Sequence, residues 1–81
     1  MRKTKEENFL LKLHELALIQ GDIHTSIDCY LVGEKLGFGT ASVNNIVQVL
    51  ASCHFIKKDG DKKVHLSDNG VVLVNQLMSE S

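Results

Sequence analysis

Apolar residues recur at steps of three and four over the first part of the chain and predict an amphipathic helix there. Thr4 and Glu7 have the spacing of a capping box, in which each side chain satisfies a free backbone amide of the first turn. We therefore expect a helix over about residues 5–20, and Gly21 suits a left-handed stop at its end. The apolar stripe of this helix consists of Phe9, Leu10, Leu13, Leu16, Ala17 and, less regularly, Ile19.

A brief strand and a short second helix are predicted next. Residues 23–25 are too few for a helix and include β-branched side chains, so we expect a strand there. Thr25 and Asp28 offer a second capping box. A helix is then expected over about residues 27–36, although Gly33 inside it costs about 1 kcal/mol relative to alanine. The apolar positions of this helix are Ile27, Tyr30, Leu31 and Leu36.

A third helix and a β-hairpin follow. A glycine-rich break precedes Thr40, which provides an N-cap for a helix over about residues 41–53. The β-prone runs of residues 54–58 and 62–66 bracket Asp59-Gly60-Asp61, a sequence typical of a hairpin turn. The apolar face of the third helix consists of Val43, Ile46, Val47 and Leu50.

The end of the chain admits two interpretations. Asn69-Gly70 lies between two β-prone runs and offers the turn of a second hairpin. Ser67, as an N-cap, instead predicts a final helix. We favour the helix, because helical spacing places four apolar residues on one side. These residues are Val71, Val74, Leu77 and Met78.

The composition fits one small domain. The chain has 81 residues, of which 43% are hydrophobic, and a formal net charge of −1. Any affinity for nucleic acid must therefore come from where the charges lie. No apolar run approaches a membrane span, so we expect no membrane partner. Cys29 and Cys53 lie in apolar surroundings and are expected in or near the core. The absence of a signal-peptide pattern favours the cytoplasm.

The segment from Val32 to Ile46 is similar to a helix-turn-helix. In that family a small residue in the first helix is followed four residues later by a glycine in the turn. Apolar residues then pack the second helix against the first. Gly33, Gly37, Val43 and Ile46 fall on these steps. Gly33 would permit close approach of the two helices, and Gly37 would adopt the backbone conformation of the sharp turn.

The lysine-flanked hairpin after the third helix resembles the wing of winged-helix proteins. Residues 66–70, Leu-Ser-Asp-Asn-Gly, are similar to the step by which MarR-like regulators enter a helix after the wing. MarR-like regulators are longer, with additional terminal helices that pair two subunits. The resemblance implies an α+β fold, a winged helix-turn-helix with a three-helix core, a short β-hairpin wing and a C-terminal helix. Its parts in the single domain 1–81 are a flexible basic arm at 1–4, the helix-turn-helix at 28–53, the wing at 55–66 and the C-terminal helix at 67–79.

The resemblance implies sequence-specific binding of double-stranded DNA by a transcriptional regulator. The third helix would enter the major groove and the wing would lie on the backbone. Asn and Gln side chains can make bidentate contacts with adenine, so Asn44, Asn45 and Gln48 are the expected base contacts. The expected phosphate contacts are Thr40, Ser42, Lys57, Lys58, Lys62 and Lys63, with Arg2, Lys3 and Lys5 as further cations on the arm.

The same residues admit plainer interpretations. The three amide side chains can form a solvated polar face, and lysines on an exposed hairpin can keep a strand edge from pairing with neighbours. Residues 40–56 carry no Lys, Arg, Asp or Glu, which is unusual for a helix that reads DNA. The alternative is a winged-helix protein–protein interaction module, in which the third helix and Phe55-Ile56 pack on a partner protein.

The remaining expectations concern assembly and chemistry. A homodimer is expected through the first and last helices, where Leu10, Ala17, Val72 and Met78 exceed what a small isolated core can bury. The sequence has no catalytic arrangement or phosphate-binding glycine loop, so we expect no enzyme activity and no cofactor. Its four His and two Cys residues lack the spacing of local zinc sites, so no metal is expected.

Overall fold

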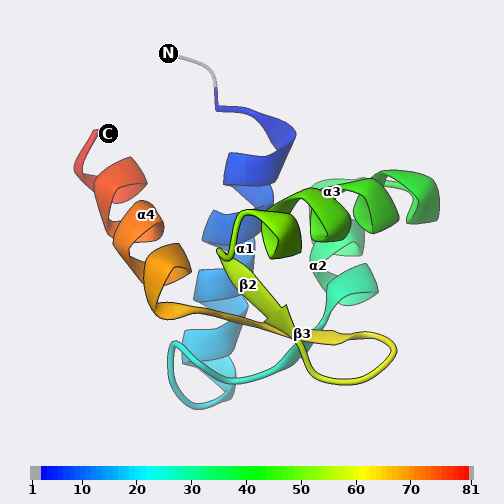
Figure 1. Ribbon diagram of the computed structural model, residues 1–81, viewed down its shortest axis with the longest axis horizontal. Coiled ribbons are helices and arrows are strands. Elements are labelled where there is room, and N and C mark those ends of the chain that lie inside the picture. Colours follow the sequence, from blue (N-terminus) through cyan, green and yellow to red (C-terminus); the bar gives the residue numbers. More distant parts are fainter. Residues whose placement is uncertain (1–2, 81) are drawn as a thin grey trace.

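A computed structural model describes residues 3–80, which form an α+β domain of four helices and a three-stranded antiparallel sheet (Figure 1). Met1 and Arg2, part of the predicted basic arm, lie outside the described residues. No helix within residues 3–80 is both long and apolar enough to cross a lipid bilayer. The elements are α1 (Lys5–Gln20), β1 (Ile27–Asp28), α2 (Cys29–Leu36), α3 (Thr40–Ser52), β2 (Ile56–Lys58), β3 (Lys63–Leu66) and α4 (Asp68–Ser79).

The start of α1 confirms the predicted capping box. The Thr4 hydroxyl accepts a hydrogen bond from the Glu7 N–H at 3.1 Å, and the Glu7 carboxylate accepts one from the Thr4 N–H at 2.8 Å. The predicted left-handed stop at Gly21 is wrong. Gly21 has φ 173° and ψ −78°, an extended φ, while its N–H still donates to the Ala17 carbonyl at 3.0 Å.

The first strand lies later in the chain than predicted. Thr25 and Asp22 form a local turn, in which the Thr25 hydroxyl accepts the Asp22 N–H at 2.9 Å. Because this turn occupies the predicted strand, β1 begins only at Ile27. Asp28, not Thr25, is the N-cap of α2, and its carboxylate accepts a backbone N–H of the first turn at 2.8 Å. The second helix therefore begins at Cys29, two residues later than expected.

Two glycines set the geometry between α2 and α3, as predicted. A Cβ atom on Gly33 would lie 2.2 Å from Cγ2 of Val43, so the helices approach more closely than any other residue would allow. Gly37 ends α2 in the left-handed region, with φ 77° and ψ 22°. The predicted cap at Thr40 is wrong. Thr40 is the first residue of α3, and Gly39 is an N-cap without a side-chain hydrogen bond.

The sheet has the strand order β1-β3-β2 and confirms the predicted hairpin. β2 and β3 are antiparallel, with Ile56 opposite Leu66 and Lys58 opposite Val64. β1 pairs with the other edge of β3, where Ile27 lies opposite Val64. The hairpin is therefore fastened to the segment that precedes α2.

A left-handed residue ends α3. His54 has φ 63°, its N–H donates to the Ala51 carbonyl at 3.1 Å, and the Phe55 N–H donates to the Leu50 carbonyl at 3.0 Å. This pair of bonds is a Schellman motif, which usually has glycine at the position of His54. The His54 carbonyl also accepts a hydrogen bond from the Ser67 hydroxyl.

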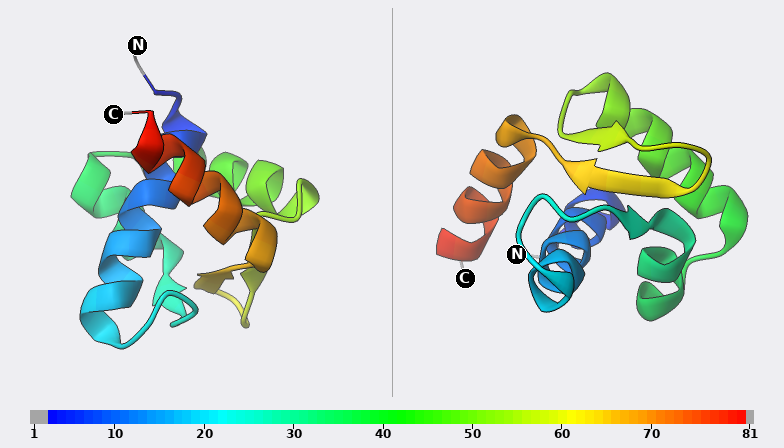
Figure 2. Two further views of the ribbon diagram at one scale, coloured as in Figure 1. Left: turned by 90° about the vertical axis from the view of Figure 1, so that its left-hand side faces the viewer. Right: turned by 90° about the horizontal axis from the view of Figure 1, so that it is seen from below.

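The final helix is confirmed, and the alternative hairpin at Asn69-Gly70 is wrong. The Ser67 hydroxyl accepts the Gly70 N–H at 3.1 Å and caps α4. A Cβ atom on Gly70 would lie 2.0 Å from the Phe55 carbonyl oxygen, so α4 begins in close contact with the exit from α3. α4 packs against α1, away from α2 (Figure 2).

The core corrects two expectations about exposure. Leu10 and Ala17, expected on a dimer surface, are buried within the domain, whereas Val72 and Met78 of α4 are 56% and 52% exposed. Cys53, expected near the core, is exposed at the end of α3. The fully buried large side chains come from all four helices and both hairpin strands and are Phe9, Leu10, Leu13, Val32, Val43, Ile56, Val64, Leu66 and Val74.

Candidate nucleic-acid interface

The exposed face of α3 carries neutral polar side chains. Four apolar residues turn the opposite face into the core, which leaves Asn44, Asn45 and Gln48 exposed to solvent. Val49 is 47% exposed and was not predicted to have a role. An apolar side chain on such a face can contact the methyl group of thymine. The buried residues that orient α3 are Val43, Ile46, Val47 and Leu50.

A hollow of about 290 Å³ lies between α3, the start of α2 and the β2–β3 hairpin. We call it the α3–hairpin hollow. Its volume is at the lower end of the roughly 300–1,000 Å³ that is usual for small-molecule sites. It is lined by Cys29, Tyr30, Asn44, Val47, Gln48, Lys58, Gly60, Asp61, Lys62, Lys63 and Val64.

The hollow brings together two of the three predicted base contacts. Asn44 and Gln48 are one helical turn apart on α3 and both line it. Asn45 does not line it and lies on the exposed face of the same helix. The amide side chains therefore fall into two groups, with Asn44 and Gln48 beside the hairpin and Asn45 further from it.

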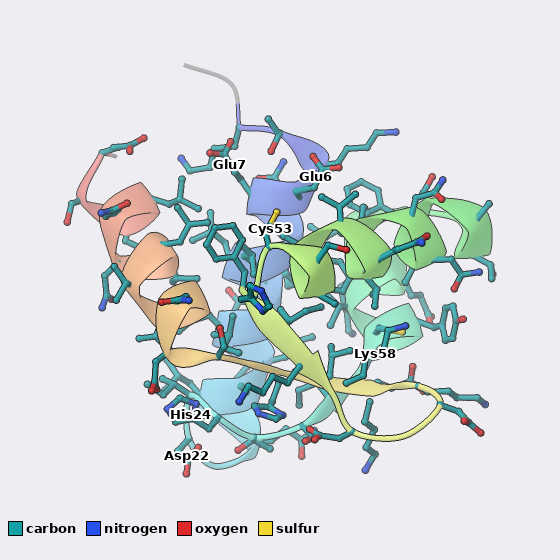
Figure 3. The ribbon with its side chains drawn as sticks, viewed as in Figure 1. Glu6, Glu7, Asp22, His24, Cys53 and Lys58 are labelled. Atoms are coloured by element: carbon teal, nitrogen blue, oxygen red, sulfur yellow. The ribbon has the colours of Figure 1, made fainter. Side chains whose placement is uncertain are left out.

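Three of the four predicted hairpin lysines line the hollow, and the fourth does not. Lys58, Lys62 and Lys63 line it, and Lys58 lies between the hairpin and α2 in the view of Figure 3. Lys57 does not line it, because its side chain points to the opposite face of β2 from that of Lys58. The same alternation along β3 places the Lys63 side chain on the Lys57 face. Lys57 is opposite His65 in the β2–β3 pairing.

The other predicted phosphate contacts lie outside the hollow. Thr40 is exposed in the first turn of α3, and Ser42 is half-buried. Lys5, predicted on the basic arm, is the first residue of α1, and its ammonium nitrogen lies 6.0 Å from the centroid of the Phe38 ring. The structure therefore does not gather these residues with the hairpin lysines.

Tyr30 belongs to the site, although the sequence pattern assigned it only to an apolar stripe. Its hydroxyl donates a hydrogen bond to Oδ1 of Asn44 at 2.6 Å. This bond leaves the amide nitrogen of Asn44 as a hydrogen-bond donor for a ligand. A tyrosine at the edge of an amphipathic helix needs a partner for its hydroxyl, and this need is the signal that could have identified it.

The charge at the hollow is positive. Three lysines and one aspartate, Asp61, line it, which gives a net charge of +2. Asp59 does not line the hollow, because its carboxylate accepts hydrogen bonds from the Ser26 hydroxyl and from Nδ1 of His65. The Ser26 bond first, and then the His65 bond, hold the pKa of Asp59 below its ordinary value. The ionised Asp59 thus joins the hairpin to the residues before β1.

The wall contributed by α2 includes an uncharged thiol. Burial, together with the neighbouring Asp28 carboxylate, raises the pKa of the Cys29 thiol. At neutral pH this group is therefore protonated and is a poor nucleophile. With Val47 and Val64 it gives the hollow an apolar, unreactive surface.

Metal ligands are not gathered at this site. Residues 3–80 contain no group of three or more His, Cys, Asp or Glu side chains placed to hold a metal ion. His24 has its Nδ1 atom 3.0 Å from the Leu66 carbonyl, and His65 bonds to Asp59. The hollow instead offers ammonium groups, amides and one phenol.

No protein-family model matches the chain. No curated protein matches its sequence either.

Proposed function

We propose that this domain is a winged helix-turn-helix that binds double-stranded DNA and acts as a transcriptional regulator. α3 enters the major groove, which admits an α-helix, and the β2–β3 hairpin lies on the sugar–phosphate backbone. One observation carries the proposal: two exposed amides of α3, Asn44 and Gln48, and lysines of the hairpin meet at one hollow. Amides suit base edges and ammonium groups suit phosphates, so the two kinds of contact are placed side by side.

The arrangement of elements supports the proposal. α2 and α3 are joined by a short turn at Gly37, and the hairpin follows α3 directly. The close approach at Gly33 fixes the angle between the two helices. A helix that reads bases must be held rigidly against its supporting helix, because bidentate contacts tolerate little displacement.

Titration of a fluorescent random-sequence duplex tests DNA binding directly. Fluorescence anisotropy is measured with purified protein at low salt and near physiological salt. Three lysines at phosphates predict a slope of log affinity against log salt of about −3. Lys58→Gln and Lys62→Gln should each flatten this slope by about 0.9. Lys57→Gln is the matched control, since it removes the same charge from the opposite face of the hairpin.

The outcomes of this titration separate the possibilities. Binding at micromolar protein that weakens with salt, and a smaller effect of Lys57→Gln, would support the proposal. An equal effect of all three lysine substitutions would remove the hollow from the interface. Absence of binding at low salt would contradict DNA binding altogether.

Base reading by Gln48 is tested on a preferred site selected from a random duplex library. Gln48→Ala should cost about 1–3 kcal/mol on the selected site, because a bidentate contact is lost. Affinity for random duplex should stay unchanged, since non-specific binding comes from phosphate contacts. Equal losses on both duplexes would contradict a base-reading role.

The regulator is proposed to act as a homodimer, because few cations face DNA from one domain. The exposed Val72 and Met78 of α4 are the proposed contact between copies. Analytical ultracentrifugation of the wild type and of Val72→Ser with Met78→Ser tests this contact. A monomeric wild type at tens of micromolar would contradict it.

A protein–protein interaction module is the second candidate function. The favouring observation is that α3 has no charged residue and exposes Val49 on the face turned to solvent. On this alternative the same face packs on a partner protein. The duplex titration decides between the two, since a protein module would not bind random DNA even at low salt.

A further inference from the structure

The α3–hairpin hollow combines three kinds of binding group in a volume of about 290 Å³. Tyr30 supplies an aromatic ring, and Asn44 and Gln48 supply amides that can meet the edge of a heterocyclic base. Lys58 and Lys62 supply ammonium groups on the hairpin side. Stacking, edge recognition and charge neutralisation are together the chemistry that a single nucleotide requires.

We propose that the α3–hairpin hollow binds a free nucleoside monophosphate. The volume suits one nucleotide and is too small for a dinucleotide, given that it lies at the lower end for small-molecule sites. The net charge of +2 favours a phosphate, and the apolar surface of Val47 and Val64 favours a flat ring.

Each part of the ligand has a counterpart. The base lies against the Tyr30 ring, with its edge toward Gln48 and toward the amide nitrogen of Asn44. The Tyr30 hydroxyl holds the oxygen of that amide, so the Asn44 nitrogen is presented as a donor for a ring nitrogen or carbonyl of the base. The phosphate lies between Lys58 and Lys62.

The aspartate of the hollow fits the remaining part of a ribonucleotide. Asp61 is the one acidic side chain that lines it, and a carboxylate only accepts hydrogen bonds at neutral pH. It would repel a phosphate but accept the ribose hydroxyls. The ribose lies on the side of the hollow that Asp61 lines.

The ligand gives the domain a means of regulation, and this step rests on the proposed function. The residues that would hold the nucleotide are the ones proposed to meet DNA, so the two ligands exclude each other. A domain of this size could thus respond to nucleotide concentration without a separate effector module.

Nuclear magnetic resonance titration tests the ligand in the absence of DNA. Labelled full-length protein is titrated with AMP, with adenosine and with inorganic phosphate, at constant ionic strength. AMP should shift the side-chain amide signals of Asn44 and Gln48 and the backbone signals of Lys58 and Lys62. Its Kd should lie about tenfold or more below that of either fragment, because both halves of the site are used.

Variants locate the site. Combined Lys58→Gln and Lys62→Gln should raise the Kd for AMP about tenfold, while Lys57→Gln leaves it unchanged. Tyr30→Leu should raise it about fivefold or more through loss of stacking, whereas Tyr30→Phe keeps the ring, loses only the hydrogen bond that orients the Asn44 amide, and should raise it less. An equal effect of Lys57→Gln, equal Kd values for phosphate and AMP, or absence of shifts with AMP would each overturn the nucleotide site.

Competition then links the ligand to DNA. AMP should displace the labelled duplex, and sodium sulfate at matched ionic strength should displace less, since salt alone weakens phosphate contacts. Binding of AMP without any DNA binding would contradict the proposed function and leave the nucleotide site standing. DNA binding without AMP shifts would overturn the nucleotide site and leave the proposed function standing.

Discussion

The phenolic hydroxyl of Tyr30 donates a 2.6 Å hydrogen bond to Oδ1 of Asn44. The two residues belong to α2 and α3, on either side of the turn at Gly37. The bond therefore joins the two helices at the exposed edge of their contact, while Gly33 and Val43 join them in the core. It also fixes which atom of the Asn44 amide is free for a ligand.

Removal of this hydrogen bond should show coupling between its partners. Tyr30→Phe and Asn44→Ala should each lower the free energy of unfolding, measured by urea denaturation. The double variant should lose less than the sum of the two, by about 0.5–1.5 kcal/mol, because one bond is removed twice. Strict additivity would show that the bond contributes nothing to stability.

Gly33→Ala should lower the free energy of unfolding by about 1–3 kcal/mol, because the new Cβ would meet Cγ2 of Val43 at 2.2 Å. Val43→Ala removes the obstructing methyl groups, so the double variant should be more stable than the sum of the two losses predicts. Gly70→Ala is the contrasting variant. Its Cβ would meet the backbone oxygen of Phe55 at 2.0 Å, and truncation of a side chain cannot relieve that clash.

His54→Gly should raise the free energy of unfolding by about 0.5–1 kcal/mol. The left-handed φ of 63° costs a residue with a Cβ roughly 1–2 kcal/mol, and the greater backbone freedom of glycine when unfolded offsets part of the gain. His54→Ala is the control, since it removes the imidazole and keeps the Cβ. Equal stabilisation by both variants would assign the effect to the side chain and not to the backbone.

Asp59 should make the stability of the domain depend on acidic pH. Hydrogen bonds from Ser26 and His65 hold the pKa of Asp59 below its ordinary value of 3.8. The folded chain therefore binds this proton less readily than the unfolded chain. The stabilisation is fully present above the ordinary pKa and is lost as the pH falls through the lower pKa of the folded state.

Urea denaturation at a series of pH values between about 5 and 2 measures this contribution. Asp59→Asn should reduce stability at neutral pH and flatten the profile below about pH 4. Ser26→Ala should flatten it in part, because one of the two hydrogen bonds remains. A profile for Asp59→Asn that parallels the wild type would contradict the assignment.

The order of the elements followed from the sequence, because capping residues and apolar periodicity act locally. Thr4 with Glu7 and Ser67 mark the starts of α1 and α4, and Gly33 and Gly37 have the roles that their spacing indicated. The position of β1 could not be predicted from the sequence in the same way. Two residues of strand are chosen by pairing with β3, which lies far along the chain, and not by their own propensity.

The residues of the site could be predicted from the sequence only in part. Exposure of Asn44, Asn45 and Gln48 was predicted from the helical period, but period alone does not show which of them faces the hairpin. The contact of Tyr30 with Asn44 depends on the angle between α2 and α3, and no local sequence pattern predicts that angle. The burial of Leu10 and Ala17 depends on how completely the other helices and the sheet cover α1.

The hairpin loop is held from outside as well as by its own strands. The Cys29 N–H donates to the Lys62 carbonyl at 2.8 Å, and the Ser26 hydroxyl bonds to Asp59. The conformational entropy of this loop is therefore lost when the chain folds, and little of it remains to be lost when a partner arrives. A ligand that meets Lys58 and Lys62 encounters a preorganised backbone, so its rate of association is set by charge and orientation and not by a loop that must first close.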